Sequence, residues 1–157
     1  MIALPNPTKI LYTEHSSDNT MTATFTDYVA QKDAQNTIQL NVTKYGLMLC
    51  DALQQSHQRQ YPNSGRNYSY ALISGRKYHK VMQCVDGQTE SVHAFIDKKT
   101  GELYEAASWK SPAKGVRFNL LIIQEREFVL DNCDWAGGYL YKNAYYLGSG
   151  YSYYQGA

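Results

Sequence analysis

The stretch NYSYALISGRKYHKVMQCV, residues 67–85, decides the fold, because its apolar side chains are spaced differently from those of the segment before it. Apolar and polar residues alternate here, which is typical of half-buried β-strands. Ser74-Gly75 interrupts the alternation and predicts a bend or a tight turn, so the stretch forms two strands or one bent strand. The alternation lets six side chains line one face: Tyr68, Tyr70, Leu72, Tyr78, Met82 and Cys84.

Two further chain reversals extend the pattern into an antiparallel meander. Asp86-Gly87 is a strong hairpin signal, and residues 91–97 alternate again after it. This alternation assigns side chains to two faces: Val92, Ala94 and Ile96 to one, His93, Phe95 and Asp97 to the other. In DKKTGE, residues 97–102, Asp97 can accept backbone hydrogen bonds and Gly101 can take the left-handed conformation before the strand LYEAAS.

The segment before the meander has helical periodicity. Its apolar stripe recurs every three or four residues: Ile38, Val42, Tyr45, Leu49, Ala52 and Leu53. Gly46 within the stripe costs about 1 kcal/mol relative to alanine, and Pro62 with the turn residues 63–65 ends the helix. Upstream, FTDYVAQKDA, residues 25–34, predicts a separate short helix that starts at Thr24 or Thr26.

These elements define an α+β fold, because a sheet with one buried face needs a cover and the helix at residues 37–60 supplies it. We expect a single domain: an antiparallel β-meander of three to four strands packed against one long helix, with a further C-terminal helix between Leu120 and Cys133. A strand at LLII, residues 120–123, is the alternative for that last segment.

The domain boundaries follow from composition. Residues 1–22 form an extended N-terminal arm, residues 23–142 the α+β domain and residues 143–157 a Tyr/Gly-rich tail. Residues 137–157 hold seven of the fifteen tyrosines, which suits a flexible or partner-docking tail. The alternative for the tail is a final strand with a frayed end.

Composition also limits the class of protein. The formal charge of +1 gives no whole-molecule attraction to nucleic acid or to an anionic membrane. No signal peptide or transmembrane run is recognised, so we expect no membrane partner and no secretion. Cys50, Cys84 and Cys133 form no metal-binding or disulfide pattern and are interpreted as buried small hydrophobes in a reducing compartment, the alternatives being one reactive thiol or a pair brought together by folding.

No catalytic motif stands out. The four histidines have no HxH or HExxH spacing, and no phosphate-binding or nucleophile-elbow motif is found, so the prediction names no catalytic residue, no metal ligand and no cofactor. His79 and His93 could be neighbours across the sheet and could hold a metal with Asp97, although solvated polar side chains are the commoner case. A small enzyme of unknown activity stays an alternative.

Local charge is the better signal. Between Arg66 and Arg117 there are nine Lys or Arg against five acids, a net charge of +4. Aromatic residues are interleaved with these charges, as phosphate contact plus base stacking requires. A solvated sheet face protected by lysines is the alternative. The loop KSPAKGVRFN, residues 110–119, is expected to contain one helical turn after Ser111-Pro112. The predicted nucleic-acid or partner contacts are Arg76, Lys77, Tyr104, Trp109, Lys110, Lys114 and Arg117.

Three segments carry a resemblance to a known group. GRKYHKVM, SVHAFIDKKTGELYEAASWKSPAKGVRFNLL and DWAGGYLY resemble small uncharacterised tailed-bacteriophage proteins with the pattern GRKY, then SVHxFxDxxTGxxxKAASWKAPAK. Glu105 stands where that pattern has Lys, and Ser111 where it has Ala. The resemblance implies a phage or phage-derived origin, hence the host cytoplasm or the virion, and it brings no activity.

The function predicted from the sequence is a non-enzymatic binding module that contacts nucleic acid through the basic loop at Trp109–Arg117. The alternative is a virion-associated or protein-interaction component, which would reach a protein partner or a second copy through the arm and the Tyr-rich tail.

Overall fold

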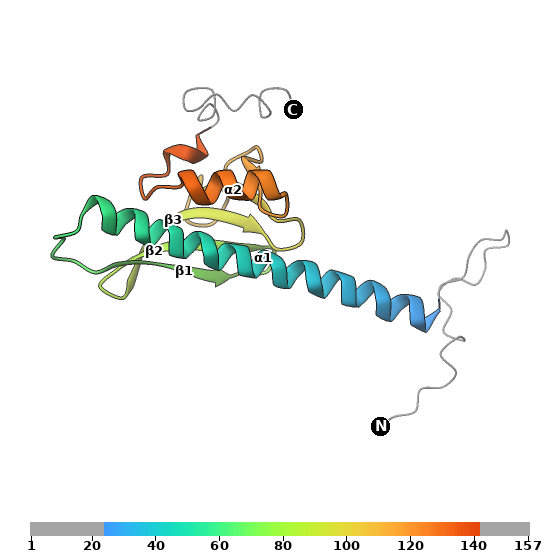
Figure 1. The fold of residues 1–157 in the computed structure, drawn as a ribbon. Helices are drawn as coiled ribbons and strands as arrows, with labels where there is room; N and C mark the ends of the chain where they lie inside the picture. The colour runs from blue at the N-terminus through green and yellow to red at the C-terminus, as the bar shows by residue number, and fades with distance from the viewer. Residues whose placement is uncertain (1–23, 142–157) are drawn as a thin grey trace. The chain divides into compact units, whose positions relative to one another are not determined.

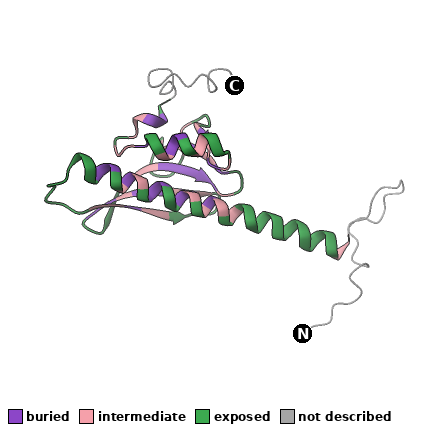
Figure 2. Cartoon of the chain, viewed as in Figure 1, coloured by how far each residue is buried: buried purple, intermediate pink, exposed green. Residues whose placement is uncertain are grey.

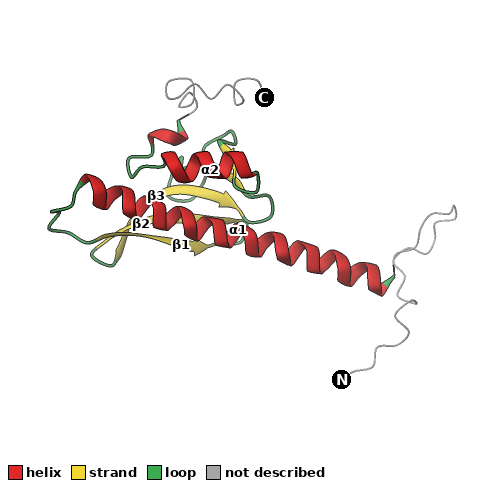
Figure 3. Ribbon diagram, in the orientation of Figure 1, coloured by secondary structure: helices red, strands yellow, loops and turns green. Residues whose placement is uncertain are grey.

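The computed structural model describes residues 24–141, which form two α-helices, five strands and a short 3-10 helix (Figures 1 and 3). In chain order the elements are α1 (Phe25–Gln60), β1 (Tyr68–Ser74), β2 (Tyr78–Val85), β3 (Gln88–Asp97), β4 (Glu102–Glu105), β5 (Phe118–Asn119), α2 (Ile123–Asn132) and the 3-10 helix η2 (Gly138–Leu140). The predicted arm at 1–22 and the predicted tail at 143–157 lie outside the described residues. Among residues 24–141, no helix has both the length and the apolar character needed to cross a bilayer.

α1 is one continuous helix, so the prediction of two separate helices was wrong. The N-terminus of α1 is capped at Thr24, one of the two helix starts predicted from the sequence. The Thr24 hydroxyl accepts from the Asp27 amide, and the Asp27 carboxylate accepts from the Thr24 amide. The chain divides into two compact units, Met1–Gln39 and Leu40–Ala157, and the boundary falls within this helix. All buried residues of α1 lie between Val42 and His57, in the second unit (Figure 2).

The five strands pair antiparallel in the order β1-β2-β3-β4-β5, which confirms the α+β class. The meander has one strand more than the three to four predicted, because residues 118–119 return beside β4. A helix does follow, from Ile123 to Asn132, so the alternative of a strand at residues 120–123 was wrong.

The two hairpin turns form as predicted. Asp86 and Gly87 both have positive φ, 52° and 84°, which matches the right-handed twist of the flanking strands β2 and β3. The Asp97 carboxylate accepts from the amides of Lys99 and Thr100, at 2.8 and 3.1 Å, and Gly101 takes φ 77°. The Asp97 side chain thus stabilises its own turn locally, whereas the Asp86 carboxylate accepts from the Asn67 amide at 2.9 Å.

The register corrects the predicted faces. Tyr70 pairs with Gln83 and Leu72 pairs with Val81, so these residues share a face. Three residues predicted on that face therefore lie on the other one: Tyr78, Met82 and Cys84. We call the side with Leu72 and Val81 the helix face, because it packs against α1 and α2.

The core lies between the helix face and the two helices (Figure 1). Val42, Leu49 and Leu53 of α1 share one buried cluster with residues of β2 to β5 and with Phe128 and Val129 of α2. At Gly46 the helix comes so close to the sheet that a Cβ would lie 3.0 Å from the Leu72 side chain. The glycine that weakens the helix is thus explained by close helix-sheet packing.

Candidate functional site

The face of the sheet opposite the helices carries lysine side chains next to aromatic rings. A cross-strand row on this face runs from Ile73 through Lys80 and Phe95 to Tyr104. Lys77 lies beside this row, its Nζ 5.3 Å from the ring centroid of Tyr78. The Tyr78 ring in turn meets Tyr104 edge-on at 6.0 Å. The structure thus brings Lys77 and Tyr104, both predicted as contact residues, to one surface.

Trp109 reaches the same surface from the loop after β4. Lys80 donates from Nζ to the Trp109 carbonyl at 2.7 Å, and the same Nζ lies 6.0 Å from the indole ring. Lys80 also lies 5.7 Å from the centroid of Phe95, which is only 1% exposed. Trp109 itself remains 49% exposed. We call Lys77, Tyr78, Lys80, Tyr104 and Trp109 the basic aromatic face.

Tyr104 is held in place by its own strand. Its hydroxyl donates to the Glu102 carboxylate at 3.0 Å. Burial, with that hydrogen bond to Glu102, raises the pKa of Tyr104 to about 12, so the phenol stays protonated. The ring therefore offers an uncharged π-surface beside the Glu102 carboxylate.

The loop at residues 106–117 is a tight hairpin without helix, so the predicted helical turn after Ser111-Pro112 was wrong. Ala106 and Pro112 form an isolated β-bridge, and the amides of Ala107 and Ser108 both donate to the Ser111 carbonyl. The Ser108 hydroxyl accepts from the amides of Lys110 and Ser111. Pairing across the loop extends Pro112, and this prevents it from starting a helix.

Arg117 is bound into the fold. Its guanidinium donates to the Leu140 carbonyl at 2.6 Å and to the carbonyls of Lys114 and Gly115 at 2.9 and 2.6 Å. It also pairs with the Glu105 carboxylate at 3.0 Å, and its side chain is only 8% exposed. These contacts hold the end of the loop against β4 and η2, and they occupy donors that a phosphate contact would need.

The other predicted contacts, Arg76, Lys110 and Lys114, are exposed. Arg76 lies in the β1-β2 turn, next to Lys77. This turn is tied to the β3-β4 turn by Lys98, whose Nζ donates to the Gly75 carbonyl at 2.9 Å. Lys110 follows Trp109 directly in the chain, whereas Lys114 lies further along the loop.

The histidine pair considered as a metal site does not form. His79 pairs with Ile96, and its ring nitrogens share hydrogen bonds with Ser74 at 2.8 Å and Thr43 at 3.3 Å. Burial, helped by the positive charge of Lys98, lowers the pKa of His79. Within residues 24–141, no three His, Cys, Asp or Glu side chains come together as a metal site would require.

The alternation assigned both Val92 and His93 to the wrong faces of β3, since Val92 pairs with Met82 on the face opposite the helices. The register passes from Val81 opposite Ala94 to Met82 opposite Val92, so His93 is an extra residue in β3. This β-bulge turns the imidazole to the helix face, where it meets the ring of Tyr70 edge-on and shares a 2.8 Å hydrogen bond with the Tyr139 hydroxyl. No feature of the sequence predicts this β-bulge.

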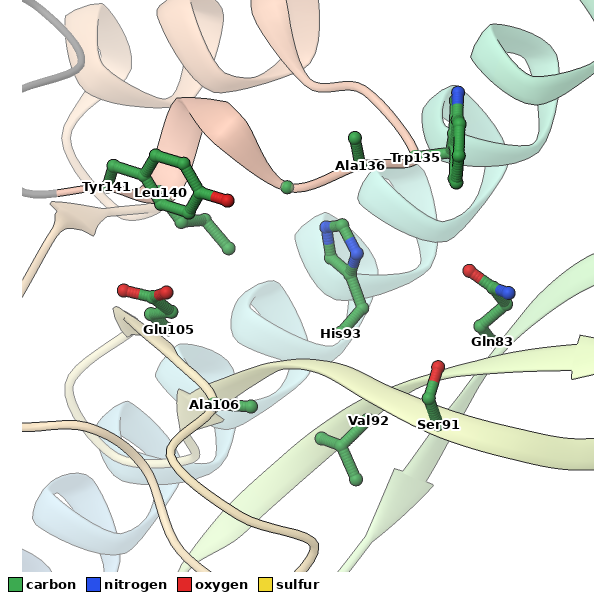
Figure 4. Close-up of a pocket in the computed structure, with 11 residues that line it drawn as sticks. Gln83, Ser91, Val92, His93, Glu105, Ala106, Trp135, Ala136, Leu140 and Tyr141 are labelled. Atoms are coloured by element: carbon green, nitrogen blue, oxygen red, sulfur yellow. The ribbon is translucent and has the colours of Figure 1, made fainter.

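The bulged strand lines a cavity of about 240 Å³ between β2, β3, the end of β4 and the segment 135–141 (Figure 4). Its lining includes Gln83, Ser91, His93, Glu105 and Trp135. Burial lowers the pKa of His93 to about 4, against a smaller opposing effect of the Asp134 carboxylate. The imidazole is therefore uncharged at neutral pH.

The three cysteines are free and buried, as predicted. Burial raises the pKa of both Cys50 and Cys133 to about 12. Since the thiolate is the reactive form, neither side chain is activated as a nucleophile.

Comparison with known protein families identifies the family of this chain. A family model described as a family of unknown function (DUF7717) matches residues 25–142. The match covers more than half of the chain, so the chain belongs to this family. A search of the curated proteins and a search of the solved structures find no match.

Proposed function

We propose that this protein is a non-enzymatic binding module that contacts single-stranded nucleic acid through the basic aromatic face. The observation that carries the proposal is the arrangement of Lys77, Lys80 and Trp109 around the rings of Tyr78 and Tyr104 on one side of the sheet. A positive surface follows the phosphates of a single strand, and its exposed aromatic rings stack on unpaired bases.

The loop extends this surface. Lys110 and Lys114 are exposed, and among the described residues neither ammonium group forms an ion pair, so both can neutralise phosphates. Arg117 is left out of the proposed contact, because its guanidinium already binds three carbonyls and Glu105.

The proposed origin follows the sequence pattern around AASWKSPAKG, which resembles small tailed-phage proteins. A phage-type binding module would act in the host cytoplasm or in the virion.

Fluorescence anisotropy with labelled single-stranded and duplex DNA and RNA, repeated across salt concentrations, tests the contact. Binding should favour single strands and should weaken as salt rises. If Lys110 and Lys114 each contact a phosphate, the double variant Lys110→Ala/Lys114→Ala should make the log-log salt slope shallower by about 1.4, at about 0.7 per phosphate. Trp109→Ala should cost about 1–3 kcal/mol of binding if it stacks on one base.

A matched control is Lys44→Ala/Arg59→Ala, which removes two exposed cations from α1, on the opposite side of the sheet. It should bind like the unaltered protein. Absence of binding at low salt, unchanged affinity in the loop double variant, or a preference for duplex over single strands would each contradict the proposal.

The interaction role for the arm and tail remains a separate prediction, supported by the tyrosine content of residues 137–157. Light scattering on the full chain and on a chain ending at Tyr141 tests it. Equal monomer masses would count against self-association through the tail.

A further inference from the structure

We propose that the cavity beside His93 binds a small uncharged heteroaromatic ligand of the nucleobase type. The site lies on the helix face of the sheet and shares no residue with the basic aromatic face. It therefore stands independently of the nucleic-acid contact proposed above.

Three polar side chains on neighbouring strands converge on the cavity. Gln83 comes from β2, and Ser91 and His93 come from β3, where the bulge directs the imidazole toward the segment 135–141 (Figure 4). The Gln83 carbonyl oxygen accepts from the Tyr70 hydroxyl at 3.1 Å, which directs its amide nitrogen away from Tyr70. Among the described residues, the Gln83 amide nitrogen, the Ser91 hydroxyl and His93 Nδ1 have no hydrogen-bond partner. These groups give the site both donors and acceptors, as the edge of a base requires.

The electrostatics favour a ligand without negative charge. His93 is neutral at neutral pH, and the guanidinium of Arg117 is already paired at 3.0 Å with Glu105, which lines the cavity. Asp134, close enough to influence His93, adds negative charge beside the site. A phosphate or carboxylate would find no free cation among the lining residues that the structure describes.

The walls suit a flat ring. Trp135 is fixed by a hydrogen bond from its indole nitrogen to Gln60 and by edge contacts with Tyr61 and His57, at 5.5 and 5.8 Å between ring centroids. At Gly137 the backbone has φ 82°, and a Cβ would lie 3.7 Å from His93 Cε1, so the chain passes close to the imidazole.

The volume of the cavity limits the size of the ligand. The volume of about 240 Å³ lies below the roughly 300–1,000 Å³ of sites for drug-sized ligands, so one or two fused rings fit best. Ser91, Ala136 and Tyr141 are exposed, which leaves the cavity accessible from solvent.

The two tryptophans of the chain make the site measurable. In the variant Trp109→Phe, Trp135 is the only indole and reports on the cavity. This variant is titrated with adenosine, cytidine, guanosine and uridine, with excitation at the red edge of the indole absorption. We expect at least one nucleoside to change the Trp135 emission in a saturable way.

Adding Ser91→Ala to the Trp109→Phe variant should weaken binding of that nucleoside about fivefold, which is the effect of losing one neutral hydrogen bond. Ser91 is exposed, so the substitution leaves the fold intact. The matched control is Ser69→Ala in β1, whose side chain lies on the face of the sheet away from the cavity; this variant should bind the nucleoside normally. Failure of all four nucleosides to give a saturable change overturns the proposal, and so does unchanged affinity in Ser91→Ala.

Two further probes test the ligand class. Toluene, a flat ring that lacks the base edge and does not absorb at the red edge of the indole band, should bind more weakly than the best nucleoside, and equal affinity would overturn the assignment. The corresponding nucleoside monophosphate should bind no more tightly than the nucleoside, because none of the lining residues within 24–141 is a cation. Tighter binding of the monophosphate, or saturable binding of inorganic phosphate alone, would likewise overturn the choice of an uncharged ligand.

Discussion

Replacing Arg117 by methionine should destabilise the fold, although the sequence places this residue in a basic surface loop. Methionine keeps most of the apolar stem and removes every donor of the guanidinium. The substitution therefore isolates the hydrogen bonds to Leu140, Lys114 and Gly115 and the ion pair with Glu105.

The magnitude follows from how well water can replace each lost partner. Leu140 is 1% exposed, so its carbonyl becomes a buried unsatisfied acceptor, which costs about 1–3 kcal/mol. The Glu105 side chain is 33% exposed and regains hydration, so loss of its partner costs roughly 0–1 kcal/mol. Lys114 and Gly115 are exposed and their carbonyls rehydrate at little cost. The expected total is about 1–4 kcal/mol out of a typical stability of about 5–15 kcal/mol.

Urea denaturation followed by far-ultraviolet circular dichroism measures this loss. With a slope of roughly 2 kcal/mol per molar, a loss of 2 kcal/mol lowers the midpoint by about 1 M without changing the slope. Lys110→Ala/Lys114→Ala is the internal control and should stay within about 0.5 kcal/mol of the unaltered protein. If Arg117→Met also stayed within that limit, the structural role assigned to the guanidinium would be wrong.

Three more outcomes follow from the packing and from the pKa values. Gly46→Val should lower the free energy of unfolding by about 1–3 kcal/mol through overpacking between α1 and β1, measured by the same denaturation, whereas an unchanged midpoint would mean that the helix moves away freely. Cys50 and Cys133, with pKa values of about 12, should react with a thiol reagent only as the protein unfolds, and fast labelling of the native protein at neutral pH would contradict their burial. Folding lowers the pKa of His93 from 6.5 to about 4. Between pH 6.5 and pH 4 the unfolded chain therefore binds more protons than the folded protein, and the free energy of unfolding decreases as the pH is lowered. The pKa of His79 is lowered as well, so His79 adds to the effect. Imidazole titration by NMR should find the His93 midpoint near 4, and a midpoint at 6.5 would refute the argument.

The turns were predictable because their chemistry is local. Asp86-Gly87 needs positive φ at both positions, and glycine with a neighbouring aspartate provides it at low cost. Asp97 likewise accepts from amides two and three residues away. Such pairs can be read from a few letters, whatever the rest of the chain does.

The faces of the strands were not predictable in the same way. Ser74 pairs with His79, so even-numbered residues of β1 lie opposite odd-numbered residues of β2, and counting straight through the turn assigns β2 to the wrong side. The bulge then shifts the pairing once more at His93. Both effects depend on pairing between strands, and a single strand contains no signal of either.

Arg117 shows the corresponding limit for the candidate site. Charge counting identified it with Lys110 and Lys114 as one basic group, but its partners Glu105 and Leu140 lie 12 and 23 residues away. Only tertiary structure reveals that a cation is already satisfied. The charge pattern therefore identifies a basic loop without separating the charges that bind the fold from those left for a ligand.

That separation is what makes the loop informative about function. Its shape is explained by the bridge between Ala106 and Pro112, the turn at Ser108 and the guanidinium of Arg117. None of these three features involves the ammonium group of Lys110 or the indole of Trp109, and the hydrogen bond that Lys80 donates to Trp109 goes to its backbone carbonyl. A loss of nucleic-acid binding at Lys110 or Trp109 with unchanged stability would therefore report contact, whereas the same loss at Arg117 would report unfolding of the loop. Stability and binding measured on the same variants distinguish the two roles residue by residue.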